Sequence, residues 1–181
     1  MSMPISAPRY TVHDLDAFPD DGNRYELLDG MLLVTPAPAQ VHQVVSLRLS
    51  SLLWSAVGRA GDAQVVGPGV IRRAPGLHLE PDILVYPPRF KPGIKWDDIS
   101  EHWLAVEILS RSSRMYDREF KRDAYLALGV PEVWLVDTIN KSVEVCRVGS
   151  NEIVRDTLRW RVPTLHRIVA IDLAEVFAGI D

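Results

Sequence analysis

Residues Trp103–Asp137, which read WLAVEILSRSSRMYDREFKRDAYLALGVPEVWLVD, decide the fold of the chain. The stretch begins and ends with apolar runs, LAVEIL and EVWLVD, which are typical of strands covered on both faces of a sheet. Between them the sequence predicts a helix that begins near Ser112 or Ser113 and ends before Gly129. Because the second strand follows the helix closely, we expect a β-α-β crossover with the two strands side by side.

This unit carries two charged residues that are candidates for a site, Glu107 and Lys121. Glu107 interrupts the first apolar run, and a carboxylate buried in such a strand is costly unless it is paired or binds a metal. Lys121 lies one residue, or about 100°, from Phe120, which we expect on the buried face of the helix. A salt bridge from Lys121 to Asp117, four residues earlier, is the ordinary alternative. The sequence leaves that choice open.

A second candidate acid, Asp82, lies upstream in Leu77–Tyr86, which reads LHLEPDILVY and which we expect to form one strand. Glu80 and Asp82 share one face of that strand. Pro81 cannot donate to a ladder, so the strand begins, bends or runs at an edge there. Two carboxylates on buried strands with a lysine nearby form the pattern of a metal site.

The amino-terminal part predicts a β-hairpin. Arg24–Leu28 and Met31–Thr35 are apolar runs joined by Asp29-Gly30, a strong signal for a type I′ turn. Glu26 lies inside the first run. It is either a surface acid of an edge strand or part of a site, and its surroundings do not decide between the two.

Two helices and one irregular segment complete the expectations. We expect a short helix at Thr11–Phe18 and a longer one that ends near Val57. His42 lies near the start of the longer helix, on a less apolar side, and we interpret it as a surface histidine rather than a ligand. Pro87–Glu101 contains three prolines, and it is either a flap over a site or a disordered connector.

The composition places the chain among ordinary globular proteins. With 181 residues and 47% hydrophobic content, residues 1–181 can form one domain with a substantial core. No run approaches 18 apolar residues, and the first residues lack the apolar region of a secretory signal. A single cysteine, Cys146, fits a reducing compartment. We therefore expect a cytoplasmic protein without a membrane segment.

The charge argues against a strongly electrostatic partner. The net charge is −4 and the pI is about 5.7, which does not favour a tight nucleic-acid binder. However, sixteen of the twenty basic residues are arginine, the better bidentate phosphate ligand. Five basic residues also lie between Arg111 and Arg122. They form either a phosphate-binding surface or an ordinary solvated helix face.

Five motifs, in order, resemble the bacterial putative restriction endonuclease family of the PD-(D/E)XK nuclease superfamily. They are RYELLDG (Arg24–Gly30), PDILV (Pro81–Val85), VEILS (Val106–Ser110), the D-x-x-x-K-x-x-x-Y pattern of Asp117, Lys121 and Tyr125, and GVPEVWLVD (Gly129–Asp137). The resemblance covers Thr11 to Val148. It implies an α/β fold of mixed α+β type: a restriction-endonuclease-like core whose mixed central β-sheet is flanked by helices, with an N-terminal helix and β-hairpin.

The resemblance also implies a site. Asp82 and Glu107 would bind Mg²⁺ or Mn²⁺ with Lys121 nearby, and Glu26, at the first acidic position of the family, would complete the catalytic set. In the superfamily pattern the lysine stands two residues after the second acid, where this chain has Leu109. Lys121 on the following helix is the residue that matches.

The function implied is that of a metal-dependent endonuclease that hydrolyses phosphodiester bonds in DNA, acting as a homodimer. The main alternative is a catalytically inactive nucleic-acid-binding or interaction module on the same fold, which the acidic net charge favours modestly. A carboxylate-pair hydrolase acting on sugars would leave Lys121 without a task. A purely structural protein would give no reason to bury Glu107.

Overall fold

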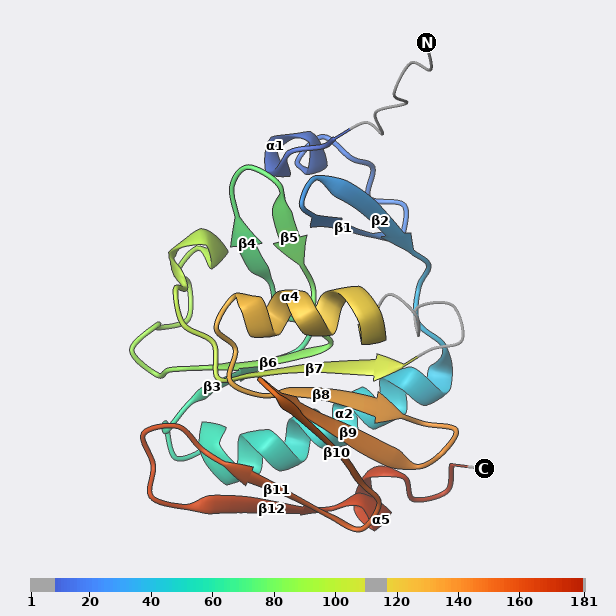
Figure 1. Cartoon of the computed structure of the whole chain (residues 1–181), viewed down its shortest axis with the longest axis vertical. Coiled ribbons are helices and arrows are strands. Elements are labelled where there is room, and N and C mark those ends of the chain that lie inside the picture. The colour runs from blue at the N-terminus through green and yellow to red at the C-terminus, as the bar shows by residue number, and fades with distance from the viewer. Residues whose placement is uncertain (1–8, 110–116, 181) are drawn as a thin grey trace.

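The central sheet is built around the expected β-α-β unit. In this computed structural model, which describes residues 9–109 and 117–180, β7 (Leu104–Leu109) and β8 (Val133–Asp137) are parallel neighbours. Every residue of both strands is buried. The crossover between them ends in α4 (Arg122–Ala127), which lies over one face of the sheet (Figure 1). The prediction for Trp103–Asp137 is confirmed, although the expected start of the helix at Ser112 or Ser113 lies outside the described residues.

The central sheet has six strands and is mixed, as expected. Its order is β10-β9-β8-β7-β6-β3, and β7–β8 is the parallel pair while the other neighbours are antiparallel. The further strands are β3 (Gln64–Val66), β6 (Ile83–Tyr86), β9 (Ser142–Arg147) and β10 (Ser150–Val154). The antiparallel pairing of β6 with β7 aligns the two segments that carry the candidate acids Asp82 and Glu107.

A second sheet contains the predicted hairpin. Its order is β2-β1-β5-β4, with β1 at Arg24–Leu28, β2 at Met31–Thr35, β4 at Ile71–Arg73 and β5 at Leu77–Leu79. The hairpin is confirmed residue for residue, and Asp29 (φ 50°) and Gly30 (φ 78°) both have the positive φ that a type I′ turn requires. β1 pairs with β5, and the chain passes from β5 into β6, so this sheet is joined to the central sheet at that point (Figure 1).

The expectation of one continuous strand over Leu77–Tyr86 is wrong, whereas the interruption expected at Pro81 is confirmed. The segment divides into β5 and β6, which belong to different sheets, and residues 80–82 connect them. Pro81 explains the break, because it lacks the N–H that would continue a ladder. As a consequence, Glu80 and Asp82 lie in the bend between the two sheets instead of in the middle of a strand.

Two apolar clusters cover opposite faces of the central sheet. One contains Val45, Leu49 and Leu53 of α2 (Gln40–Leu53), which continues as a π-helical segment η1 (Trp54–Gly58). The other contains Tyr125 of α4 together with Leu79 of β5. Both helices therefore flank the sheet, as the fold class predicts.

Shorter elements close the molecule. They are α1 (Val12–Leu15), the 3₁₀ segment η2 (Trp96–Asp98), β11 (Thr157–Arg161), β12 (Ile168–Asp172) and α5 (Leu173–Val176). In the segment Pro87–Glu101, Phe90 and Ile99 are buried in the second cluster and anchor it. No helix in residues 9–109 or 117–180 is long and apolar enough to cross a membrane.

Candidate active site

Asp82 lies in the bend just before β6, and Glu107 lies in the neighbouring strand β7. The register Ile83↔Val106 between β6 and β7, continued by one residue, sets Asp82 opposite Glu107. The two segments are in contact here, because the N–H of Ile108, the residue after Glu107, donates to Asp82 Oδ2 at 2.8 Å. Both side chains are buried, with 3% and 2% of their surface exposed. Glu107 points to the same side of β7 as Ala105 and Leu109, which belong to the apolar cluster that includes Tyr125. Glu107 therefore lies on the face of the sheet that α4 covers.

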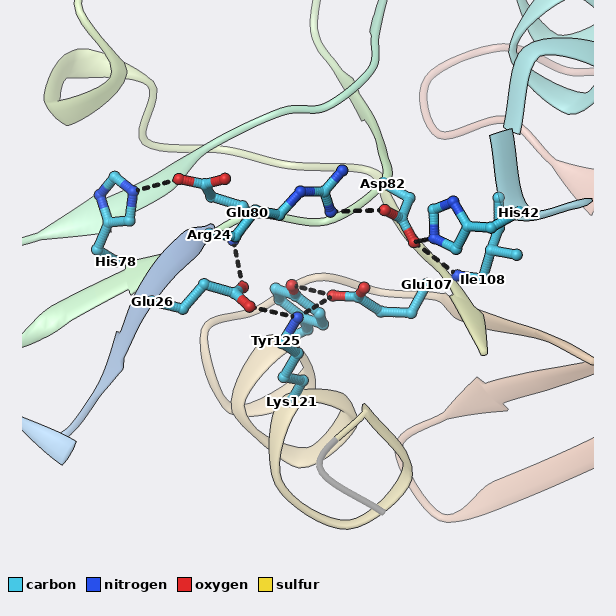
Figure 2. A network of polar contacts seen from close by, with 10 residues as sticks. All are labelled: Arg24, Glu26, His42, His78, Glu80, Asp82, Glu107, Ile108, Lys121 and Tyr125. Carbon is cyan, nitrogen blue, oxygen red and sulfur yellow. Dashed lines mark hydrogen bonds and ion pairs between the residues drawn. The ribbon is translucent and has the colours of Figure 1, made fainter. Parts of the chain in front are cut away.

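The carboxylate of Glu107 is held by two side chains from the crossover helix. The hydroxyl of Tyr125 donates to Glu107 Oε1 at 2.6 Å, and Lys121 Nζ lies 3.3 Å from the same oxygen (Figure 2). These contacts supply the partners that a buried carboxylate requires. The Asp-x-x-x-Lys-x-x-x-Tyr spacing thus places a lysine and a tyrosine, four residues apart on one helix, on the same acid.

Lys121 also bonds to Glu26. Its Nζ lies 2.8 Å from Glu26 Oε2, so one buried ammonium group joins β1 to β7. Both partners of Lys121 belong to strands outside the crossover helix. The side chain of Asp117, the alternative partner considered from the sequence, lies outside the described residues. Lys121 is only 4% exposed. The amine is therefore a central member of the cluster.

The prediction that Phe120 lines the buried helix face is wrong. Phe120 is 41% exposed, and Lys121 and Tyr125 occupy the inner face instead. Lys121 and Tyr125 are four residues apart, so they share one helix face, and their contacts with Glu26 and Glu107 hold that face against the buried acids.

Glu26 is buried, which excludes the alternative that it is a surface acid of an edge strand. Its exposed fraction is 1%, and its Oε1 accepts a hydrogen bond from the backbone N–H of Glu80 at 2.7 Å. Burial raises the pKa of Glu26 above its ordinary value, although the charge and hydrogen bond of Lys121 act in the opposite direction.

Asp82 is held by three donors. Arg24 Nη1 lies 2.8 Å from Oδ1, His42 Nε2 lies 2.9 Å from Oδ2, and the N–H of Ile108 donates to Oδ2 at 2.8 Å (Figure 2). Burial alone would raise the pKa of this carboxyl. The hydrogen bonds and charges around it, with His42 first, hold the pKa below its usual value. Asp82 is therefore an ionised acid enclosed by hydrogen-bond donors, one of which is the guanidinium of Arg24.

Sequence reasoning missed two residues of this enclosure, Arg24 and His42. His42 was expected at the surface, but it is 9% exposed and its ring reaches Asp82. Its spacing of three residues before Val45, on the stripe that continues to Leu49, was the signal for its burial. Arg24 lies two residues before Glu26 on β1, so the two side chains point to the same face of the strand.

The described residues fit a divalent cation in donor chemistry, with one obstacle. Asp82 and Glu107 offer the hard carboxylate oxygens that Mg²⁺ and Mn²⁺ prefer, and such ions need only one or two carboxylates beside water and phosphate. However, no three His, Cys, Asp or Glu side chains in residues 9–109 and 117–180 are grouped to hold a metal. Because Arg24 and His42 occupy Asp82, an ion bound there has to compete with them.

The fold and this acid-rich cluster define the class, that of the restriction-endonuclease-like proteins. A crystal structure described as that of a putative nuclease belonging to DUF820, from Anabaena variabilis ATCC 29413, matches the chain with a TM-score of 0.74. The match covers 92% of this chain and 97% of the other, at 20% sequence identity, and shows a common fold.

The family follows from the sequence match. A model of the Uma2 family, which bears the description "Putative restriction endonuclease", matches residues 12–174. The match spans most of the 181 residues, so the chain belongs to the Uma2 family. The resemblance expected from the five motifs is confirmed. No functionally curated protein matches the chain.

Proposed function

We propose that this protein is a metal-dependent endonuclease that hydrolyses phosphodiester bonds in DNA. The observation that carries the proposal is a set of buried charged side chains contributed by separate segments. Lys121 joins Glu26 to Glu107, and Asp82 occupies the register position opposite Glu107. Membership of the restriction endonuclease family supports the nuclease class. The metal and the DNA substrate are the parts that experiment has to establish.

In this proposal Asp82 and Glu107 hold Mg²⁺ or Mn²⁺. A divalent ion, when bound, supplies Lewis acidity toward a phosphate oxygen and lowers the pKa of a coordinated water. Lys121 directs its N–H donors at the attacking water or at the charge that develops on the phosphate. Glu26 fixes the position of Lys121, and the hydroxyl of Tyr125 fixes Glu107.

The test is cleavage of supercoiled plasmid and of end-labelled duplex DNA with Mg²⁺, with Mn²⁺ and with EDTA. We expect cleavage in either metal and none in EDTA. Asp82→Asn and Glu107→Gln should lower the rate about a hundredfold or more, the size of losing a preorganised electrostatic group. Circular dichroism must show that both variants are folded. Retained cleavage in both folded variants would overturn the site assignment.

A buried acid outside the cluster offers a matched control. Glu132 accepts hydrogen bonds from Trp134 Nε1 at 2.6 Å and from Arg147 Nε at 2.8 Å. Glu132→Gln therefore removes a buried carboxylate of the same chain without touching the four site residues. We expect this variant to cleave DNA at the wild-type rate. A similar loss in Glu132→Gln and Glu107→Gln would mean that the losses reflect general destabilisation.

The second candidate is an inactive nucleic-acid-binding or interaction module. The enclosure of Asp82 favours it, because Arg24, His42 and the Ile108 N–H occupy both carboxylate oxygens. Titration calorimetry with Mn²⁺ separates the two candidates. An endonuclease binds Mn²⁺ in the wild type and loses binding in Asp82→Asn. A module shows DNA binding that is indifferent to metal, without cleavage.

We further propose a cytoplasmic homodimer. Cutting both strands of a duplex suits a symmetric pair of sites, and C₂ dimers are the commonest assemblies. A single, buried cysteine, Cys146, fits a reducing compartment. Light scattering coupled to size-exclusion chromatography, with and without duplex DNA, measures the assembly. A mass of one 20.3 kDa chain under both conditions would exclude the dimer.

A further inference from the structure

Arg24 reaches from β1 into the acid cluster. Its Nη1 lies 2.8 Å from Asp82 Oδ1, and 23% of its side chain remains exposed, against 3% for Asp82. Arg24 therefore stands between the buried acid and the surface. Figure 2 shows its guanidinium directed at Asp82, with Glu80 and Glu107 in the surrounding cluster.

Most hydrogen-bonding capacity of Arg24 is unused within the described chain. A guanidinium carries five N–H donors, and within residues 9–109 and 117–180 Arg24 makes one hydrogen bond, to Asp82. Arg72, with a similarly buried side chain, bonds to both oxygens of Asp16 and to the carbonyl of Val12. Arginine forks favour two parallel bonds to a carboxylate or a phosphate. The remaining N–H donors of Arg24 can therefore bind an acceptor that offers two oxygens, such as a phosphate.

Nearby carboxylates hold the guanidinium of Arg24 in the acid cluster. Its guanidinium forms an ion pair with the buried carboxylate of Asp82, and Glu80 and Glu107 lie in the same cluster (Figure 2). Arg24 is thus the cation that balances Asp82 in this structure. A divalent ion on Asp82 would take over that task and repel the guanidinium.

We infer that Arg24 is a substrate-binding residue that exchanges Asp82 for a DNA phosphate when a divalent cation binds to Asp82. The inference rests on the proposed function and deepens it. The ion displaces Arg24 from the carboxylate by like-charge repulsion. The displaced fork remains near the site on a short strand, with its donors available to two oxygens of one phosphate. Arg24 therefore competes with the metal in the absence of DNA and assists DNA binding in its presence.

The first measurement is Mn²⁺ affinity without DNA, by titration calorimetry of wild type, Arg24→Gln and Arg24→Lys. Removing the competing cation should tighten Mn²⁺ binding about tenfold in Arg24→Gln, a size typical of coupling between two ligands of one site. Arg24→Lys keeps the charge and should stay near wild type. A merely structural salt bridge would predict weaker Mn²⁺ binding in Arg24→Gln, because Asp82 would lose its support.

The second measurement is DNA affinity by fluorescence anisotropy with a labelled 20-mer duplex, in Ca²⁺ and in EDTA. In Ca²⁺ we expect Arg24→Gln to bind about tenfold more weakly than wild type, since a phosphate contact at a charged group is lost. Arg24→Lys, which has a charge but no fork, should be intermediate. In EDTA all three proteins should bind alike, because Arg24 is then engaged with Asp82.

Arg147 gives the matched control. It too makes one hydrogen bond to a buried carboxylate, Glu132, but outside the cluster. Arg147→Gln should change neither measurement. Wild-type protein that binds no Mn²⁺ overturns the proposed function together with this inference. Wild type that binds Mn²⁺, with Arg24→Gln binding it equally or more weakly, or with equal DNA affinity in Ca²⁺, overturns the role of Arg24 alone.

Discussion

The ammonium group of Lys121 and the carboxylate of Glu26 meet 2.8 Å apart inside the protein, although they belong to the crossover helix and to the amino-terminal hairpin. Both side chains are almost fully buried. The contact fastens the small sheet to the central sheet at the point where Glu107 lies. A single ion pair therefore contributes both to the union of the two sheets and to the geometry of the candidate site.

Lys121→Met should destabilise the fold by about 3–5 kcal/mol, because it leaves two buried carboxylates without their cation. Urea unfolding followed by circular dichroism measures the change. Lys95→Met, at an exposed lysine, should stay within about 0.5 kcal/mol of wild type. Adding Glu26→Gln to Lys121→Met should cost less than Glu26→Gln alone, since one unpaired charge disappears. Additive effects would show that the two residues are not coupled.

Tyr125→Phe should cost about 1.5–3 kcal/mol and slow DNA cleavage, because the hydroxyl donates to the charged Glu107 at 2.6 Å. The substitution keeps the ring that packs in the core. Tyr86→Phe removes a hydroxyl from another buried tyrosine of the same apolar cluster and serves as the control, with an expected change below about 0.5 kcal/mol. Equal stability losses in the two variants would contradict a special role for the Tyr125 hydroxyl.

Local signals explain why the hairpin and the β-α-β unit could be predicted from the sequence. Asp29-Gly30 specifies a turn by its own backbone preferences, and the apolar runs around Glu107 specify strands covered on both faces. These features depend on neighbouring residues in the chain. The same holds for the capping box of Thr11 and Asp14, in which both hydrogen bonds are present.

Tertiary partners explain what the sequence could not predict. The division of Leu77–Tyr86 depends on which sheet receives each half, and the burial of Glu26 depends on the pairing of β1 with β5. The inward direction of Lys121 depends on its contacts with Glu26 and Glu107, which belong to strands of two different sheets. The candidate acids were therefore identifiable one by one, whereas the ion pairs between them and the enclosure of Asp82 were not.

His42→Phe should raise the pKa of Asp82. Burial opposes ionisation of this carboxyl, and the hydrogen bond and charge of His42 contribute most among the groups that hold its pKa down. Phenylalanine fills similar space without donating, so Asp82 keeps only Arg24 and the N–H of Ile108. A ¹³C NMR titration of the Asp82 carboxyl measures the shift. His78→Phe, whose histidine contacts Glu80 instead, is the control. An unchanged pKa in His42→Phe would contradict this role of the imidazole.

His102 should make the protein less stable on acidification below neutrality. Burial, followed by the charge of Arg73, lowers the pKa of His102 from 6.5 to about 4. Between pH 6.5 and pH 4 the imidazole of His102 is protonated in the unfolded chain but neutral in the folded protein. The free energy of unfolding therefore keeps its full value above pH 6.5 and decreases as the pH falls toward 4. The full loss is roughly 3 kcal/mol, since each pKa unit corresponds to about 1.4 kcal/mol. Urea unfolding at pH 7.5 and at pH 4.5 measures it.

The variant His102→Gln isolates this contribution, because glutamine is neutral throughout the pH range. The difference in unfolding free energy between pH 7.5 and pH 4.5 should shrink by roughly 2–3 kcal/mol relative to wild type. His166→Gln removes an exposed histidine and should leave the difference as it is in wild type. The Nε2 atom of His102 is buried and lacks a hydrogen-bond partner, so a proton there would have no acceptor within the described residues. An unchanged pH dependence in His102→Gln would therefore mean that the folded protein accommodates the imidazolium.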